Sequence, residues 1–443
     1  MVTKRVRILL YLFLFVCAQT SGAESARISR AELREAIHGW WIGQLVGNYL
    51  GFPFENLYAD EPIPVLIERY HDFRDAGSGL RMNTDDRRAY VRIMADAFGG
   101  AWSDDDTDVE LVTLHAVEAH GLGLNYEQIT AFWRAHINRF VWSATRIARD
   151  LMEQGHFPPA TGSRALNEHW FSISSQLKTE IWGVFYAGMP NAAVRRAEWD
   201  ARIMTDAWAT HPDMLYAAMI SAAFFEKDPR TLVEGALAHV PDGSPFARGV
   251  RELLRWRDEH PDWRTARAML HERYYREVDG FVVPVPILGS VINGLCGVMA
   301  LLYGEGDFTR TLAIATSAGY DCDNQAATIG GLLGVMYGAG AIPEHFTHDM
   351  PSRGRWSVPF NDTYVNYSRD GLPNRFSISA LVDRILAVTE KAIVASGGTR
   401  TETGSDGVVY LVAVDATVDL PEGSGETKHD LQPAHESKPI VDW

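Results

Sequence analysis

The residues with the clearest chemical potential are a run of acids from Ser103 to Glu110, in which five of eight residues are carboxylates. Apolar residues follow at roughly helical spacing, so the run is expected at or just before a helix N-terminus. Capping and a favourable first-turn charge account for one or two such acids. Asp104, Asp105 and Asp106, however, repel one another unless a cation or a tight hydrogen-bond network compensates. Hard divalent cations favour oxygen ligands of this kind, so the run predicts a metal site.

A second acidic stretch lies far downstream, where residues 319–325 read Gly-Tyr-Asp-Cys-Asp-Asn-Gln. It is followed directly by a small-residue apolar run over 326–337, so it too is expected at the start of a helix. Neither acidic stretch is persuasive alone. Two helix-start loops that each offer at least two oxygen ligands predict one shared site if the fold brings them together.

A third contributor follows the first predicted helix. Ser29 and Glu32 have capping-box spacing. The helix that they open has glycine at every fourth position, at residues 39, 43, 47 and 51. Glycine inside a helix costs up to about 1 kcal/mol relative to alanine, so this bare stripe predicts close approach by other helices. Glu55 comes just after the end of that helix, in the apolar context Phe-Pro-Phe-Glu, and is a candidate ligand.

Other polar residues receive structural interpretations. The segment 83–86, Asn-Thr-Asp-Asp, superficially resembles a further acidic motif, but Arg87 and Arg88 follow and neutralise it, so we predict a solvated loop. His211 is a lone histidine and is expected in a loop or at the surface. An EF-hand calcium loop beginning at Asp104 is excluded, because its sixth position would be Val109, where the loop requires glycine. The sequence contains no P-loop, nucleophile elbow, dinucleotide fingerprint or zinc-type Cys/His spacing.

Composition narrows the possible partners. The 443 residues are 46% hydrophobic, which suits a globular protein with a substantial core. The net charge of −16 argues against nucleic acid or an anionic membrane surface, because both are bound mainly through clustered Lys and Arg. The same charge suits a protein that binds cations.

The N-terminus has the three zones of a secretory signal peptide: basic residues, an apolar stretch over 8–17, and small residues ending at Ala23. Residues 1–23 are therefore expected to be removed, which predicts a secreted or periplasmic protein. Ten apolar residues are too few for a bilayer span of about 20, so no integral membrane segment is expected after cleavage. A lipid anchor at Cys17 fits poorly because Val16 precedes it. Cys296 and Cys322 would remain, and a disulfide between them stays open.

The body of the chain is predicted to be all-α and compact, with one domain over residues 24–395. Helical patterns recur without a run of alternating strands, at residues 126–154, 170–186, 192–225, 287–303, 307–318 and 377–395. From residue 396 the composition turns to Gly, Thr, Ser and Glu, with one alternating segment over 408–418. Residues 396–443 are therefore predicted to be a linker and low-complexity tail with a possible short strand pair.

At the three candidate motifs the chain resembles the ADP-ribosylglycohydrolase family, whose members are all-α hydrolases that remove ADP-ribose with two magnesium ions. The glycine-rich helix ending at Glu55 is similar to the family's opening motif. The run at 103–107 is similar to its Asp-Asp-Thr motif, and residues 319–331 are similar to its Asp-x-Asp motif. The similarity runs from about residue 33 to 345 in motif order, and it implies an orthogonal multi-helix fold with a short C-terminal appendage.

The resemblance also implies roles for individual residues. It makes metal ligands of the acids and one amide in the three motifs, namely Glu55, Asp104, Asp105, Asp106, Asp321, Asp323 and Asn324. Asp104 stands where the family usually has a hydroxyl ligand, and Asn324 stands where it often has threonine. Both can still coordinate through oxygen. Asn48 is a further departure, because the family often has aspartate there.

The implied reaction is hydrolysis of an N- or O-glycosidic bond at ribose. Two Mg²⁺ ions, with Mn²⁺ possible, would lie about 3.5–4 Å apart, as in other two-metal sites. They would hold the ribose hydroxyls and position a water for attack. Glu55 or Asp105 would orient or deprotonate that water. The loop of Gly319 and Tyr320 would bind substrate, with backbone N–H groups meeting the pyrophosphate. Tyr320 would stack on the ligand or serve only packing.

The implied partner is an ADP-ribosylated protein or a small ADP-ribose conjugate. A non-catalytic protein that keeps the metal site and binds ADP-ribose-like ligands remains an alternative. A metal-dependent phosphoesterase, which would release phosphate, is a third possibility. The presence of both Glu55 and Asp323 favours the enzyme.

Overall fold

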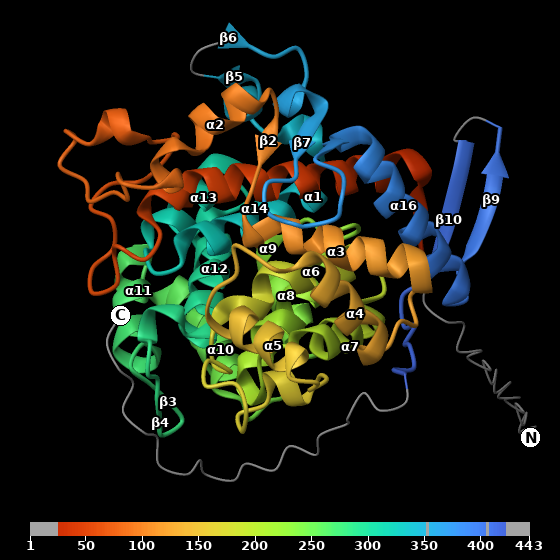
Figure 1. The fold of residues 1–443 in the computed structure, drawn as a ribbon, viewed down its shortest axis with the longest axis horizontal. Coiled ribbons are helices and arrows are strands. Elements are labelled where there is room, and N and C mark those ends of the chain that lie inside the picture. Colours follow the sequence, from red (N-terminus) through yellow and green to blue (C-terminus); the bar gives the residue numbers. More distant parts are fainter. Residues whose placement is uncertain (1–24, 351–353, 405–406, 422–443) are drawn as a thin grey trace, which may run out of the picture.

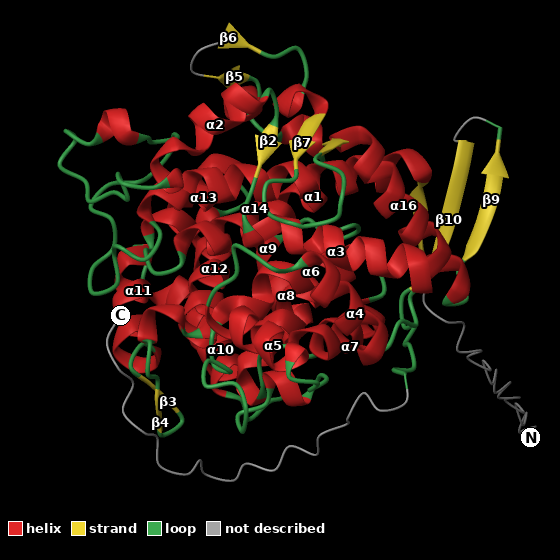
Figure 2. Cartoon of the chain, in the orientation of Figure 1, coloured by secondary structure: helices red, strands yellow, loops and turns green. Residues whose placement is uncertain are grey.

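The computed structural model describes residues 25–350, 354–404 and 407–421. The predicted signal peptide, with Cys17, lies outside these residues. The described chain is dominated by compactly packed helices with a few short strands at the periphery, which confirms the all-α prediction (Figure 2).

The helices are α1 (Arg30–Gly51), α2 (Val91–Phe98), α3 (Asp105–His120), α4 (Tyr126–His136), α5 (Ser143–Glu153), α6 (Gln176–Phe185), α7 (Pro190–Ala201), α8 (His211–Ala222), α9 (Pro229–Leu237), α10 (Pro245–Glu259), α11 (Trp263–Tyr274), α12 (Ser290–Gly304), α13 (Phe308–Ser317), α14 (Cys322–Tyr337), α15 (Glu344–Thr347) and α16 (Ile378–Ala395). The pattern predicted over 126–154 is two helices, α4 and α5, separated by a turn at 137–142.

Helices α1 and α14 form the centre of the fold, side by side across the upper half of the molecule (Figure 1). The capping box predicted for α1 is present, with Ser29 accepting from the Glu32 backbone N–H and Glu32 accepting from the Ser29 backbone N–H. The glycine stripe explains the close approach. A Cβ on Gly43 would lie 2.0 Å from the backbone oxygen of Gly330, and one on Gly47 would lie 1.9 Å from that of Ala326. Only glycine permits this contact along α1.

The remaining helices pack around this pair. Helices α12 and α13 contact each other and α14, while α6 contacts α3, α7 and α8. Large aromatic side chains fill the space between them, and Trp40, Trp41, Trp102, Trp133 and Trp182 are all fully buried. The core is therefore continuous from α1 to the helices around α6.

Two small sheets tie distant parts of the chain together. In the first, β2 (Ala101–Trp102) pairs in parallel with β7 (Thr363–Val365), which pairs with β8 (Arg375–Ser377). In the second, β1 (Ser25–Ser29) pairs with β10 (Gly407–Ala413), and β10 pairs with β9 (Thr399–Thr403). Two hairpins of two-residue strands complete the set, β3 (Glu277–Val278) with β4 (Phe281–Val282) and β5 (Asp349–Met350) with β6 (Gly354–Arg355).

The second sheet contains residues that were predicted as part of a linker and tail. Strands β9 and β10 stand at one edge of the molecule (Figure 1). Tyr410 and Val412 of β10 are buried in the core, and the Tyr410 hydroxyl donates to Glu390 at 2.8 Å. The segment 399–413 is thus packed against the helical body.

Three smaller points follow from the packing. Cys296 and Cys322 are both buried thiols, so the disulfide left open by the sequence is not formed. His211 is buried at the start of α8, so its expected surface position is wrong. Among the described helices, none combines the length and apolarity needed to cross a bilayer.

Candidate functional site

The ends of α1 and α14 bring three carboxylates together. Glu55 follows the short 3-10 helix at the end of α1, Asp321 is the N-cap of α14, and Asp323 lies in its first turn. One oxygen from each lies within 4.8 Å of the others. We call Glu55, Asp321 and Asp323 the acidic triad.

Close backbone contacts fix this arrangement. A Cβ on Gly51 would lie 2.3 Å from the Cα of Asp323, so the last glycine of the stripe sets the start of α14 against the end of α1. The loop after Glu55 is joined to the loop before Asp321, because the backbone N–H of Asn56 donates to the Tyr320 oxygen at 2.9 Å. The glycine stripe therefore positions ligands as well as helices.

The acidic run delivers Asp104, Asp105 and Asp106 to the same place. Strand β2 ends one residue before the run, and its pairing with β7 fixes where α3 begins. Asp104 is the N-cap of α3, but its side chain makes no capping hydrogen bond. Its carboxylate is therefore available to the site instead of the helix.

Asp106 is held by two amides. Asn48 donates to one carboxylate oxygen at 2.9 Å, and Asn324 donates to the other at 3.2 Å. Asn324 is buried, and its amide N–H orients Asp106, while its Oδ1 accepts no hydrogen bond from the described residues; its role as a metal ligand stays a prediction. Asn48, the residue that departs from the family pattern, likewise orients Asp106 from α1.

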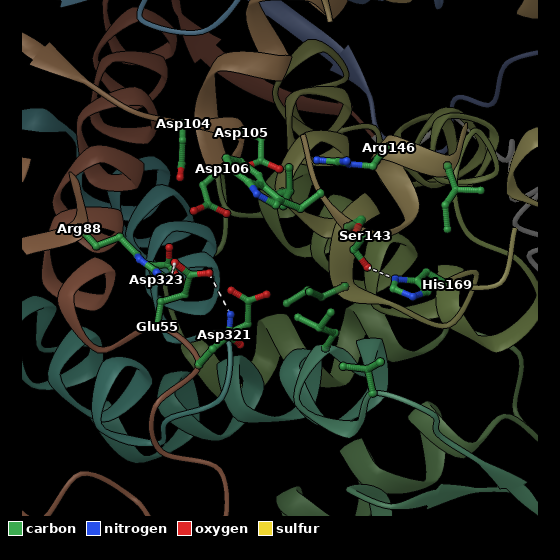
Figure 3. Close-up of a pocket in the computed structure, with 18 of the residues that line it drawn as sticks. Glu55, Arg88, Asp104, Asp105, Asp106, Ser143, Arg146, His169, Asp321 and Asp323 are labelled. Atoms are coloured by element: carbon green, nitrogen blue, oxygen red, sulfur yellow. Dashed lines mark hydrogen bonds and ion pairs between the residues drawn. The ribbon is translucent and has the colours of Figure 1, made fainter. Parts of the chain in front are cut away.

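These acids form one side of a cavity of about 640 Å³ (Figure 3). The opposite side carries Ser143 and His169, whose Oγ and Nδ1 atoms lie 2.8 Å apart, together with Arg146. Apolar side chains complete the lining, namely Trp142, Ile147, Ile173, Leu177, Val285 and Leu288. The cavity thus has an acidic side suited to cations and a mixed side suited to the rest of a ligand.

No sequence motif marks Ser143 or His169. Ser143 begins α5 with a φ of 48°, in the left-handed region that a β-carbon disfavours. Such strain persists only where the surroundings enforce it, and it often marks functional sites. The fold, through the turn between α4 and α5, brings this residue to the cavity.

The two arginines that follow the segment predicted as a solvated loop reach the acidic side. Arg87 donates to Asp104 at 2.9 Å, and Arg88 contacts both Asp86 and, at 3.3 Å, Glu55. Asp86 of the segment and both arginines line the cavity. Residues 83–86 form a partly exposed loop, as predicted, and Arg88 pairs with Asp86; in addition, the two arginines neutralise acids of the site.

Gly319 and Tyr320 are not among the residues that line the cavity, and their contact with substrate stays a prediction. Tyr320 is fully buried, its hydroxyl lies 2.8 Å from His271 Nδ1, and Arg267 lies over its ring. Gly319 has a φ of +81°, and a Cβ there would lie 1.9 Å from the Tyr58 oxygen. Both residues hold the loop that presents Asp321.

Burial and mutual repulsion make the acidic side costly when all its groups are ionised. Burial, and then the neighbouring Asp104, raises the pKa of Asp105 to about 7. Burial and repulsion from nearby carboxylates also raise the pKa of Asp106, Asp321 and Asp323 well above the usual range. A bound cation would oppose each of these shifts, because it favours the ionised form.

Buried oxygens without partners point the same way. Within the described residues, Oδ1 of Asp104 and Oδ1 of Asp323 are buried and accept no hydrogen bond. Such atoms carry a desolvation cost that a cation ligated by oxygen removes. The donor set therefore fits a hard divalent cation.

Comparisons with known proteins bear on the family of this chain. A family model described as ADP-ribosylglycohydrolase matches residues 29–383. A search of curated proteins returned no match. A solved structure described as an "ADP-ribosylglycohydrolase-related protein complex" has 17% sequence identity and a TM-score of 0.49, and covers 82% of this chain and 99% of that chain. Because the family model spans most of the sequence and all three acidic motifs, this chain belongs to the ADP-ribosylglycohydrolase family.

Proposed function

We propose that this protein is a cation-dependent hydrolase that cleaves an N- or O-glycosidic bond at the ribose of an ADP-ribosyl or related ribosyl substrate. The observation that carries the proposal is the meeting of the acidic triad with Asp104, Asp105 and Asp106 on one side of a cavity. Family membership supports glycosidic hydrolysis as the reaction type. The proposed cation is Mg²⁺, with Mn²⁺ fitting the same oxygens.

The residues of the acidic side have separable roles. Asp321 and Asp323 would hold the cation, and Asn48 and Asn324 keep Asp106 in a fixed orientation. When bound, a hard divalent cation supplies positive charge that stabilises an oxygen bearing developing negative charge and helps orient ligand hydroxyls. Glu55 and Asp105 face the cavity and would orient and deprotonate the attacking water.

The rest of the cavity suits the rest of such a substrate. Trp142 is 40% exposed and offers a ring for stacking, and Arg146 offers a guanidinium to an anionic group. The carboxylates would stabilise the positive charge that develops at the anomeric carbon during glycosidic cleavage. The two sides together suit a molecule with a ribose at one end and an anionic or aromatic portion at the other.

The test is hydrolysis of a panel of mono-ADP-ribosylated proteins, small N- and O-linked ADP-ribose conjugates and simple ribosides, with free ADP-ribose or ribose followed by chromatography. Glu55→Gln keeps the side-chain size but removes the charge, so turnover should fall about 10²–10⁴-fold while binding of ADP-ribose largely survives. Glu118→Gln is the matched control, because Glu118 lies on α3 but forms a surface ion pair with Arg384.

The results separate the alternatives. Glu55→Gln turning over as fast as the parent would remove the catalytic role of that residue. Binding of ADP-ribose by the parent without cleavage of any panel member would favour the ligand-binding protein. Release of inorganic phosphate in place of ADP-ribose would identify a phosphoesterase.

We also propose export of the protein, on the sequence pattern of residues 1–23. The mature N-terminus should be Glu24, one residue before β1 begins at Ser25. N-terminal sequencing of protein from the native host is the measurement. An intact Met1 on active cytosolic protein would contradict export.

A further inference from the structure

Arg87 occupies an unusual place on the acidic side of the cavity. It comes from the 3-10 turn Arg87–Tyr90, and its Nη2 donates to Oδ2 of Asp104 at 2.9 Å. The side chains of Arg87 and Asp104 are 22% and 5% exposed, so this ion pair is largely shielded from water. A shielded pair of this kind is screened little by salt.

Aromatic rings hold the guanidinium in place. Its central carbon lies 4.8 Å from the ring centroid of Trp142, 5.5 Å from that of Phe52 and 5.6 Å from that of Phe140. Attraction of a cation to aromatic faces strengthens when both are desolvated. Arg87 is therefore fixed beside Asp104 by packing as well as by charge.

The acids around Arg87 do not form a second converging set. Among the described residues, the acidic triad is the one group of three whose ligand atoms approach within 4.8 Å of each other. Asp106 has both oxygens engaged by the amides of Asn48 and Asn324. Oδ2 of Asp104 is engaged by Arg87, while its Oδ1 accepts no hydrogen bond from the described residues. At the acidic triad three carboxylates converge, and the nearby Arg88, 3.3 Å from Glu55, is mainly paired with Asp86. At Asp104, by contrast, no such set converges and Arg87 already supplies a positive charge.

We propose that the Arg87 guanidinium is a built-in cation of this centre, which takes the place of a second divalent ion beside Asp104, so that the chain binds a single divalent cation tightly at the acidic triad. The inference rests on the proposed function for the identity of that triad as the cation site. Guanidinium stays protonated at all working pH values, so it does not vacate the position by losing its charge. A divalent ion at Asp104 would meet direct repulsion from Arg87.

The proposal differs from the two-ion centre that the family resemblance implies, and it assigns a different role to Asp104. Asp104 is the counter-ion of Arg87, and its charge is balanced within the chain. Removing Arg87 should therefore uncover a second site, formed by Asp104 with Asp105, while removing Asp104 should leave the tight site intact.

The test counts bound ions without any substrate. Full-length mature protein is stripped with chelator and titrated with Mn²⁺, and bound and free ions are separated by electron paramagnetic resonance and calorimetry. The parent should bind one ion tightly, with any second ion at least about tenfold weaker. Arg87→Met, which keeps the apolar stem over the rings, should bind two ions, with the second at least about tenfold tighter than in the parent.

Two further variants make the result decisive. Arg146→Met removes another arginine that lines the same cavity but donates to the backbone oxygen of Val141, so it should bind one ion like the parent. Asp104→Asn should also retain the single tight ion. If Arg87→Met fails to fold, the ion count of Asp104→Asn tests the proposal in its place.

The proposal is overturned if the parent binds two ions of similar affinity, if it binds none, if Arg87→Met shows no second ion, or if Asp104→Asn weakens the tight ion more than about tenfold. The count is independent of turnover. A parent that binds one ion but cleaves nothing in the panel would contradict the proposed reaction and leave this inference standing.

Discussion

The contact between α1 and α14 allows a sharp test with a single methyl group. Gly47→Ala would place a Cβ 1.9 Å from the backbone oxygen of Ala326 and 2.2 Å from its carbonyl carbon. No rotamer can relieve this overlap, because every atom involved is backbone. The two helices must separate locally, and the separation would loosen the packing on either side of the contact.

The size and sign of the effect follow from two opposing terms. Alanine favours a helix over glycine by up to about 1 kcal/mol. Overpacking in a filled core typically costs about 1–3 kcal/mol and occasionally more. With a clash against backbone and no side chain to move, the cost should lie at the upper end, so we expect Gly47→Ala to destabilise the fold by about 2 kcal/mol.

Gly235→Ala is the matched control. Gly235 lies inside helix α9, and a Cβ there would have no atom within 4 Å. The same substitution should therefore stabilise the protein by about 0.5–1 kcal/mol, through helix propensity and the reduced freedom of the unfolded chain. Urea unfolding of both variants, followed by far-ultraviolet circular dichroism, gives the comparison through the transition midpoints.

The reasoning would be refuted if Gly47→Ala were as stable as the parent or as Gly235→Ala. Such a result would mean that α1 and α14 are not in backbone contact. A functional readout should move in parallel, because the stripe continues to Gly51, which packs on Asp323. Gly51→Ala should weaken Mn²⁺ binding more than Gly235→Ala does.

Three further predictions concern buried charge and the cation. Arg369→Met should lower the free energy of unfolding by about 3–5 kcal/mol, because it leaves Asp108 buried without its partner at 2.7 Å. Arg384→Met, which breaks a surface ion pair, should lower it by under about 1 kcal/mol in the same urea assay. Equal losses would contradict the buried pair. Burial raises the pKa of Asp213 to about 8, so its contribution to stability is full below about pH 4, where the unfolded carboxyl is also protonated, and is lost as the pH rises towards 8. Asp213→Asn should flatten the pH dependence of the unfolding free energy between about pH 4 and 8 by up to about 1.4 kcal/mol per pH unit. An unchanged profile would contradict a neutral Asp213. Mg²⁺ at 100 times its dissociation constant should stabilise the parent by about 2.7 kcal/mol, chelator should reverse the effect, and a similar gain in Asp321→Ala would place the ion elsewhere.

Much of the acidic side could be predicted from sequence because its chemistry is local. Three adjacent aspartates before a helix are costly wherever the fold puts them, so Asp104, Asp105 and Asp106 stand out without a structure. Glu55 and Asp321 are less conspicuous, and their pairing with the run depended on the order of motifs. The glycine stripe predicted a close helix contact, but only the fold identifies α14 as the partner.

Sequence reasoning missed contacts that depend on the direction of a side chain. Arg87 and Arg88 follow two acids and were interpreted as their local counter-ions; Arg88 does pair with Asp86, but Arg87 pairs with Asp104 on the acidic side of the cavity. Tyr320 adjoins Asp321 in sequence, but its φ of 63° belongs to a turn that directs the ring towards His271 in the interior.

Ser143 and His169 could not be paired from sequence, because no motif links them. They meet only because α5 begins beside the loop that precedes α6. A short strand pair within residues 396–443 was expected, but the third strand was not: β10 is the central strand of its sheet, and its second neighbour is β1, from the opposite end of the described chain.

The pairing of α1 with α14 also dictates an order of events during synthesis. Helix α1 ends at Gly51 and its partner begins at Cys322. At about 5–20 residues per second, a ribosome needs roughly 14 to 54 seconds to make the roughly 270 residues between them. For that time the glycine face of α1 has no native surface to cover it, so this helix is the segment on which a nascent-chain chaperone would be expected to act. The acidic triad also forms only after this interval, because Asp321 and Asp323 are made after the roughly 270 intervening residues.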